Sequence, residues 1–274
     1  MSARSVRVRS GVHSAPAAVG DDAGTFRQVR LYNLVVGLIH LMQAVALLLL
    51  SNDFGLPVTG QFLAGPPGTE FTPVEELFSI AVGPAVAFFL FLAAVDHLLM
   101  AAPGVNAWYN AKLGKGINYA RWWEYSVSAS VMIVLIAMVT GVSDIGVIIA
   151  IFGVNAAMIL FGMLMEMTND ADRKVNWGPY IFGCIAGIVP WIIITIQITG
   201  AETRATDGGV PTFVYGIIVS LFLLFNSFAI NQFLQYKNVG KWRDYIFGEK
   251  VYLLLSLTAK TALAWQVFAN TLIE

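Results

Sequence analysis

The chain has 274 residues, of which 57% are hydrophobic and only 12% are charged. A soluble domain is about 45–50% apolar and about 25% charged, so this composition, with a mean hydropathy of +0.71, excludes an ordinary soluble globule and indicates an integral membrane protein. The 16 basic and 17 acidic residues leave no basic face for nucleic acid. Cys184 is the single cysteine, which excludes a disulfide-linked module and predicts a buried, unreactive thiol.

The first residues are small and polar and carry three arginines with no apolar run after them. They do not resemble a cleavable signal peptide, so residues 1–26 are predicted to form a disordered cytoplasmic tail and residues 27–274 a single domain. A helix needs about 20 apolar residues to cross a bilayer, and seven stretches nearly free of charge meet this length. The predicted fold is an all-α membrane protein, a bundle of seven transmembrane helices. The predicted spans are 28–51, 75–101, 117–142, 144–168, 176–200, 209–236 and 246–273.

The connection between the first two spans, residues 51–76, is the longest and is rich in glycine and proline. A loop of this length is uncommon without structure or function of its own. We therefore expect a short β-hairpin within residues 54–63, which caps the bundle or contacts a partner.

The basic residues are distributed unevenly about the spans. Fourteen of the 16 fall in the tail and in the connections on the same side as the tail, whereas the other side has Arg204 alone among eight acidic residues. Cytoplasmic loops of membrane proteins carry the excess of lysine and arginine. The N-terminus is therefore predicted to be cytoplasmic and the C-terminus extracellular.

Lys260 lies near the middle of the last span, where a lysine costs roughly 2.5–3.5 kcal/mol on insertion scales. Such a cost favours an amine used chemically, either in a Schiff base with a carbonyl cofactor or in an ion path, over a purely structural lysine. Glu124, about one turn into the third span, is the best partner by sequence and would be the counterion of a protonated Schiff base. The alternative for Glu124 is a pair with Arg121 on the adjacent turn.

Two histidines, His40 and His97, lie at a depth compatible with Glu124 and predict a proton-holding cluster, although a histidine in a span is often only hydrogen-bonded to a neighbouring helix. Ser256 shares a helix face with Lys260 and is expected to bond its nitrogen or, alternatively, its own backbone. Asp96 and Glu166 are expected to be rim residues rather than proton carriers.

Several aromatic residues fall inside the spans, where most aromatic side chains simply pack. A flat conjugated ligand would nonetheless need such walls. Proline at position 190 is expected to loosen the fifth span beside Trp191. The interior aromatics are Trp123, Trp191, Phe222, Phe225 and Trp265.

Seven spans with a lysine in the seventh resemble the retinal-binding rhodopsins, and the sequence is more specifically similar to the heliorhodopsins. The resemblance lies in Lys260 within SLTAKTALAWQVF, in Glu124 within RWWEY, in His40 and His97, and in an N-terminus on the inside. Ordinary microbial rhodopsins share the fold but place the N-terminus outside. The resemblance covers the chain from about Arg27 to the C-terminus.

This resemblance implies a rhodopsin-like bundle that binds all-trans retinal on Lys260, with Glu124 as the sole counterion, photoisomerisation to the 13-cis form and a slow photocycle. It also implies a homodimer through residues 51–76 and neighbouring helices in the lipid bilayer. A cytoplasmic signalling partner is expected; a metal site and enzymatic activity are not. The residues expected at the retinal site are Lys260, Glu124, Ser256, His40, His97, Trp123, Tyr125, Ser128, Asn155, Trp191, Phe222, Phe225 and Trp265.

The sequence is compatible with three functions. The first is a photosensory receptor without ion pumping, because the places of the second carboxylate and the proton donor of pumping rhodopsins are taken by Ser256 and Leu135. The second is a light-gated proton or cation channel, with Asp96, Glu166 and the two histidines forming a cytoplasmic half-channel. The third is a transporter without retinal that uses Lys260 and Glu124 as an ion pair. A light-evoked current separates the second from the first, and a visible chromophore excludes the third.

Overall fold

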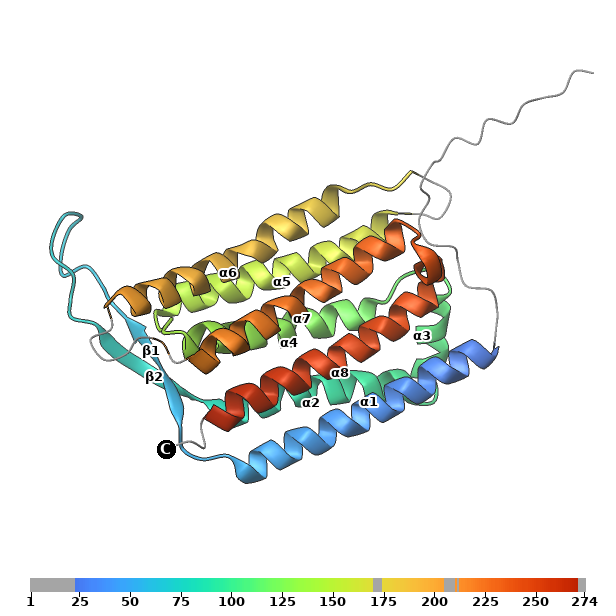
Figure 1. Cartoon of the computed structure of the whole chain (residues 1–274), viewed down its shortest axis with the longest axis horizontal. Helices are drawn as coiled ribbons and strands as arrows, with labels where there is room; N and C mark the ends of the chain where they lie inside the picture. The colour runs from blue at the N-terminus through green and yellow to red at the C-terminus, as the bar shows by residue number, and fades with distance from the viewer. Residues whose placement is uncertain (1–22, 170–173, 205–209, 211, 271–274) are drawn as a thin grey trace, which may run out of the picture.

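The computed structural model of the chain describes residues 23–169, 174–204, 210 and 212–270. Within this part of the chain, seven helices are long and apolar enough to cross a membrane, and they run side by side in one bundle (Figure 1). The bundle is therefore that of a multi-pass membrane protein. The seven helices are α1 (Ala23–Leu50), α2 (Val82–Ala101), α4 (Tyr119–Val139), α5 (Ile145–Thr168), α6 (Gly178–Arg204), α7 (Thr212–Tyr236) and α8 (Tyr245–Asn270).

The helices pack in a ring. α1 packs against α2 and α8, α2 also packs against α4, and α5 lies between α4 and α6, while α7 packs against α8. Side-chain contacts between α6 and α7, such as Trp191 with Phe222, close the ring. A large apolar core fills the end of the ring near the first loop and includes Leu47, Val86, Leu135 and Phe268. A smaller core fills the opposite end, around Tyr109.

The start of α4 is fixed by its N-cap. The side chain of Asn118 accepts a hydrogen bond from the backbone N–H of Arg121 at 3.1 Å, which satisfies a donor that a helix terminus would otherwise leave unpaired. A short helix, α3 (Val105–Leu113), precedes it and packs Tyr109 and Leu113 into the bundle. Gly104 allows the turn into α3, because its φ of +86° is unfavourable for residues with a side chain. The cap thereby sets the register at which α4 presents its first polar residues.

The first loop forms a two-stranded antiparallel hairpin at one end of the bundle, on the left in Figure 1. β1 (Gly55–Gly60) lies where a hairpin was expected, but its partner is β2 (Glu75–Ala81) and not a strand within residues 54–63. The predicted second span began at residue 75, whereas α2 begins at Val82. The low charge of this segment does not distinguish a strand from a helix, and its pairing with β1 decides the structure.

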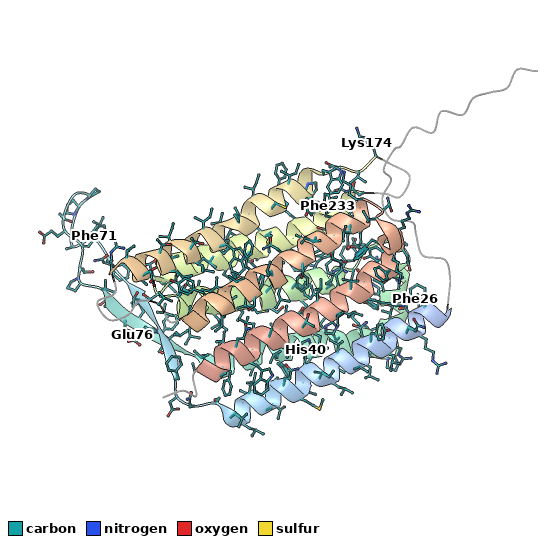
Figure 2. The ribbon with its side chains drawn as sticks, in the orientation of Figure 1. Phe26, His40, Phe71, Glu76, Lys174 and Phe233 are labelled. Carbon is teal, nitrogen blue, oxygen red and sulfur yellow. The ribbon has the colours of Figure 1, made fainter. Side chains whose placement is uncertain are left out.

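The hairpin is anchored to the connection between α4 and α5. The backbone N–H of Thr59 donates to the carbonyl of Ser143 at 2.8 Å, and the two hydroxyls lie 2.9 Å apart. Val58 is fully buried in the apolar core. The tip of the hairpin beyond β1 is different, because Phe62, Leu63 and Phe71 are all exposed there. Figure 2 shows Phe71 beyond the end of the bundle.

The chain ends differ from the predicted boundaries. Residues 1–22 of the predicted tail lie outside the described residues, and residues 23–26 belong to α1 and not to a tail. The last predicted span extends to residue 273, but residues 271–273 lie outside the described part. A 3₁₀ helix, η1 (Gly240–Arg243), fills most of the connection between α7 and α8.

Candidate functional site

Lys260 and Glu124 form a buried ion pair between α8 and α4. The Lys260 Nζ donates to both carboxylate oxygens of Glu124 at 2.8 Å, and the two side chains are 4% and 6% exposed. Ser256 Oγ lies 3.4 Å from the same nitrogen, and the Tyr125 ring centroid lies 4.7 Å from it. The alternative pair of Glu124 with Arg121 does not form, because Arg121 bonds other carboxylates. A buried pair of this kind is stable only while both charges remain.

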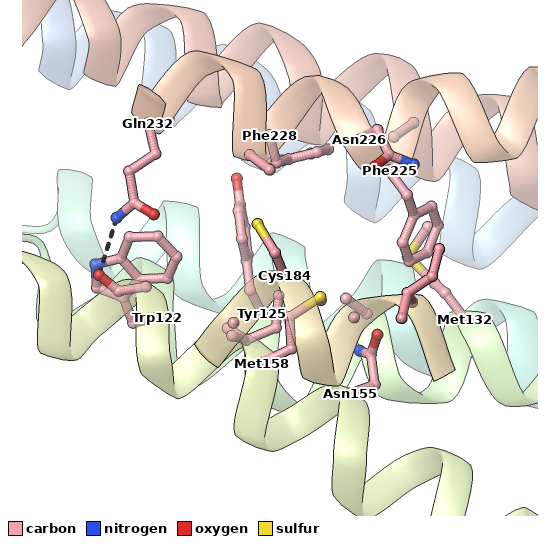
Figure 3. A pocket seen from close by; sticks show the side chains of 18 of the residues that line it. Trp122, Tyr125, Met132, Asn155, Met158, Cys184, Phe225, Asn226, Phe228 and Gln232 are labelled. Atoms are coloured by element: carbon pink, nitrogen blue, oxygen red, sulfur yellow. Dashed lines mark hydrogen bonds between the residues drawn. The ribbon is translucent and has the colours of Figure 1, made fainter. Parts of the chain in front are cut away.

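A cavity of about 390 Å³ opens beside this ion pair, among α4, α5, α6, α7 and α8. Lys260 is part of its wall, and most of the remaining lining is apolar or aromatic. Figure 3 shows Trp122 and Gln232 at one end and Met132 and Phe225 at the other, with Tyr125 between them. The lining from residue 122 to residue 132 of α4 corresponds to about 15 Å of helix. The cavity is therefore elongated, with an amine in its side wall.

The structure brings part of the predicted site to this cavity. Besides Lys260, the predicted residues in the lining are Tyr125, Ser128, Asn155, Trp191 and Phe225. The Asn155 amide donates to Ser130 Oγ at 3.1 Å, so it also ties α5 to α4. Ser128 Oγ is fully buried and has no hydrogen-bond partner among the described residues.

Three predicted aromatic residues lie elsewhere. Trp123 is 59% exposed and Trp265 is 40% exposed, and neither is part of the cavity lining. Phe222 packs edge-on against Trp191 at a centroid distance of 5.1 Å, but it stands behind the lining. Being inside a span does not decide which face of the helix a residue occupies, and these side chains fall on outward or second-row positions.

Sequence reasoning missed several lining residues. The clearest is Trp122. Helical periodicity could have identified it, because positions 122, 125, 129 and 132 follow the spacing of one helix face, whereas position 123 does not. Cys184 was expected to be a buried thiol, but it is exposed and lines the cavity. The other missed residues with large side chains are Met132, Met158, Ile159, Tyr180, Ile188, Asn226, Phe228 and Gln232.

The two histidines lie together on α1 and α2. Their rings stack with centroids 5.9 Å apart and an angle of 11° between planes. His97 Nδ1 is 2.9 Å from the side-chain oxygen of Asn33, while neither nitrogen of His40 has a hydrogen-bond partner among the described residues. Both rings are close enough to Lys260 to interact with it electrostatically. Figure 2 shows His40 on α1, well inside the bundle.

A second group of charges lies toward the α3 end of the bundle. Arg121 of α4 bonds Glu166 of α5 at 2.5 Å and also bonds Glu249 of α8, and all three side chains are buried. We call these three residues the charged cluster. Glu166 was expected at the rim but is buried within the cluster. Glu249 was not predicted, because its partners are distant in sequence.

Asp96 of α2 lines a small polar pocket next to the charged cluster, together with Arg121, Glu249 and Tyr109. Burial raises the pKa of the Tyr109 hydroxyl, on α3, to about 12, because it disfavours the charged form. The buried charged groups and the histidines thus form two adjoining sets, which lie toward the α3 end of the bundle. One set surrounds Lys260 and the other surrounds Arg121.

Comparison with solved structures shows a shared fold. The chain is similar to the light-driven proton pump rhodopsin CsR of Coccomyxa subellipsoidea, with a TM-score of 0.64 and 19% identity over 92% of this chain and 99% of that chain. It is also similar to the light-driven proton pump LR (Mac) of Leptosphaeria maculans, with a TM-score of 0.61 and 16% identity over 94% and 97% of the chains. The transmembrane domain of the rhodopsin phosphodiesterase of Salpingoeca rosetta gives a TM-score of 0.64 and 13% identity over 90% and 85%. These low identities show the fold alone.

Comparison by sequence identifies the family. No curated protein sequence matches the chain. The heliorhodopsin family profile, in contrast, matches residues 29–272, which is nearly all of the bundle, including the lysine of α8 and the glutamate of α4. The chain therefore belongs to the heliorhodopsin family.

Proposed function

We propose that this protein is a photosensory receptor that binds all-trans retinal covalently through Lys260 and does not pump ions. The observation that carries the proposal is the place of the Lys260 amine, in the wall of a large apolar cavity and bonded to Glu124. Membership of the heliorhodopsin family supports it, because the family implies a retinal chromophore and a light-sensing protein.

The residues of the cavity fit retinal, which is a long, flat, apolar aldehyde. An amine is needed to hold the aldehyde carbon, and Lys260 offers one beside the cavity. Trp191, Phe225 and Phe228 supply flat apolar walls, as conjugated ligands need. When bound, retinal supplies absorption of visible light and a change of shape from all-trans to 13-cis.

The residues around the Lys260 nitrogen would then hold a positive charge in a medium of low dielectric. Glu124 balances that charge, and the face of the Tyr125 ring stabilises it further. Loss of the proton at this nitrogen removes the attraction to Glu124, so the contact between α4 and α8 has to rearrange. A charge change that alters a helix contact is the kind of event that switches a receptor between two states.

His40 and His97 are proposed to form a polar network that receives and holds this proton. Imidazole exchanges a proton near neutral pH, and His40 has two ring nitrogens without a partner among the described residues. The hydrogen bond between His97 and Asn33 fixes the second ring in place. A proton held on this network would delay recovery of the resting state, consistent with a slow photocycle.

We further propose that the N-terminus is cytoplasmic and the hairpin extracellular, on the basis of the positive-inside rule. Labelling of intact cells with a membrane-impermeant thiol reagent tests this in a Cys184→Ala background. Thr69→Cys at the hairpin tip should be labelled and Lys115→Cys at the opposite end should not. The reverse pattern would refute the orientation.

The exposed hairpin tip supports the expected homodimer, and a cytoplasmic signalling partner would bind at the other end.

The deciding experiment is the visible spectrum of protein expressed with all-trans retinal. The wild type should show a visible band, Lys260→Ala should lack it, and Lys250→Ala should retain it as the control on the same helix. Folded but colourless wild-type protein would exclude the receptor, and Lys260 would then have to be explained as half of an ion pair in a transporter.

A light-gated proton or cation channel is the second candidate. The small polar pocket lined by Asp96 and Arg121 favours it, because it extends polar contacts beyond the Lys260 site. Voltage clamp under illumination separates the candidates: a receptor gives no current, and a channel gives a current that reverses sign with the driving force.

A further inference from the structure

Trp122 belongs both to the cavity wall and to the surroundings of the charged cluster. Its ring lines the cavity and its side chain is almost fully buried. Its indole Nε1–H donates to Glu166 at 2.6 Å. The neighbouring Trp123, in contrast, is 59% exposed and is not in the lining. Of two adjacent tryptophans, one therefore connects the cavity to the cluster.

The indole ring of Trp122 is closely confined. It packs over Gly162 of α5, where an added Cβ would lie 2.5 Å from the ring, so only glycine leaves room for it. The Arg121 guanidinium lies 4.4 Å from the ring centroid, and the Tyr252 ring packs edge-on at 6.0 Å. Figure 3 shows the ring at one end of the cavity beside Gln232, whose side chain bonds the carbonyl of Gly162. The ring therefore has little freedom to move without disturbing a neighbour.

Glu166, which accepts the indole hydrogen bond, is one of the two carboxylates of the charged cluster. It also accepts from Arg121, from the backbone N–H of Asn118 and from the hydroxyl of Tyr245. These donors come from α4, from its N-cap and from α8. A shift of the indole therefore changes the hydrogen bonding of a carboxylate that joins α4, α5 and α8.

We propose that Trp122 is a positioning residue that couples the shape of the cavity's ligand to the charged cluster through its hydrogen bond to Glu166. This coupling rests on the proposed function, since it takes retinal as the ligand. A ligand that changes shape in the cavity would push against the confined indole ring of Trp122. The displaced ring would disturb the hydrogen bond from its Nε1–H to Glu166. The hydrogen bond to Glu166 lengthens or reorients, and the bonds that Glu166 makes to Arg121 and Tyr245 adjust. Light absorbed by retinal bound at Lys260 would thereby alter the helix contacts at the α3 end of the bundle.

Light-minus-dark infrared spectroscopy of the retinal-loaded protein tests the coupling. The carboxylate band of Glu166 is assigned by its disappearance in Glu166→Gln. We expect this band in the wild-type difference spectrum and its loss in Trp122→Phe, which keeps an aromatic ring but removes the Nε1–H. Trp123→Phe is the matched control and should retain the band. The chromophore's own isomerisation bands should persist in both variants.

The outcomes are distinct. An unchanged Glu166 band in Trp122→Phe, or no Glu166 band in the wild type, overturns the coupling while the visible spectrum leaves the proposed function intact. A colourless wild type overturns both. If Trp122→Phe does not form a pigment, Gly162→Ala decides, because its methyl group presses on the indole ring and leaves the donor in place. The coupling predicts a shifted Glu166 band in Gly162→Ala, and an unshifted band would refute it.

Discussion

At the scale of single residues, the ion pair of Lys260 and Glu124 is simple in composition. Among the described residues, Glu124 accepts side-chain hydrogen bonds from Lys260 alone. The charge balance at this nitrogen therefore depends on one carboxylate. If Glu124 is replaced, no other carboxylate among the described residues bonds Lys260 in its place. Asp96 is within electrostatic range of both groups but has no direct bond to either.

Glu124→Gln should consequently change the spectrum and its pH dependence. Without the negative charge, the protonated linkage at Lys260 is no longer stabilised against its neutral form. The visible band should be shifted strongly or lost at neutral pH, and acidification should restore it, because the protonated form is favoured as pH falls. A pH titration of the absorption spectrum measures this, with Glu75→Gln on the hairpin as the control. An unchanged spectrum and titration in Glu124→Gln would remove Glu124 from the role of counterion.

Arg121 contributes to the stability of the fold, because it is bonded to two buried carboxylates, Glu166 and Glu249. Arg121→Gln would leave Glu166 and Glu249 without their cation, and breaking a buried pair in this way typically costs about 3–5 kcal/mol. We expect a marked fall in the thermal unfolding temperature, and partial recovery when Glu249→Gln is added. Arg243→Gln, at an exposed position, should have no such effect. If Arg121→Gln were as stable as the wild type, the charged cluster would contribute little to the fold.

At the scale of elements, the sequence predicts helices well and their faces less well. Absence of charge over about 20 residues marks a membrane helix, and each of the seven predicted spans overlaps a long helix. The same rule wrongly assigned Glu75–Ala81 to a helix. These residues form a strand because they pair with Gly55–Gly60, about twenty positions away, and a local rule does not detect such pairing. Trp123 was predicted at the site instead of Trp122 for a related reason: hydropathy indicates depth in the membrane but not which helix face a side chain occupies.

Contacts between helices were the least predictable part of the site. The pairing of Lys260 with Glu124 was proposed because both residues are costly in a membrane and few other charges lie at that depth. Glu249 lies in the second turn of α8, near the basic loop, and so resembled an ordinary surface acid. Only the packing of α8 against α4 brings it to Arg121. The charged cluster therefore depends on tertiary structure that no local pattern encodes.

The hairpin is the element expected to join two protomers. Its strands are fixed to the bundle through Thr59 and Ser143, while Phe62 and Phe71 are exposed beyond them. Exposed apolar side chains gathered outside a membrane commonly mark an interface. We expect the wild type to be a dimer in detergent, and the double variant Phe62→Ser, Phe71→Ser to be a monomer with an unchanged visible band. Size-exclusion chromatography with light scattering checks this, and Trp108→Ser at the other end of the bundle is the control. A dimer that survives the double substitution would place the interface elsewhere.

At the scale of the whole molecule, the buried charged and titratable groups are distributed unevenly between the two halves of the bundle. The half that contains α3 holds the histidines, Asp96 and the charged cluster, whereas the hairpin half holds the large apolar core and neutral polar pairs such as Ser220 with Gln266. A transported proton needs groups that can take it up and release it on both sides of the Lys260 site. This division is therefore the feature of the fold that bears most directly on whether light moves ions through it.

We expect no sustained light-driven current. On the hairpin side of Glu124, α4 continues with Ile133, Leu135 and Ile136, all buried in the apolar core. Ser256 stands where a pumping rhodopsin usually has its second carboxylate, and its hydroxyl bonds Lys260 without carrying a charge. A proton released from Lys260 can be held by the histidines and returned, but the described part of the core on the hairpin side offers it neutral groups, such as Ser220 and Gln266, and no charged one. Illuminated cells should show no net change in external pH, with and without a protonophore. A protonophore-sensitive pH change in the wild type that Lys260→Ala abolishes would contradict this and show that ions cross the apolar half.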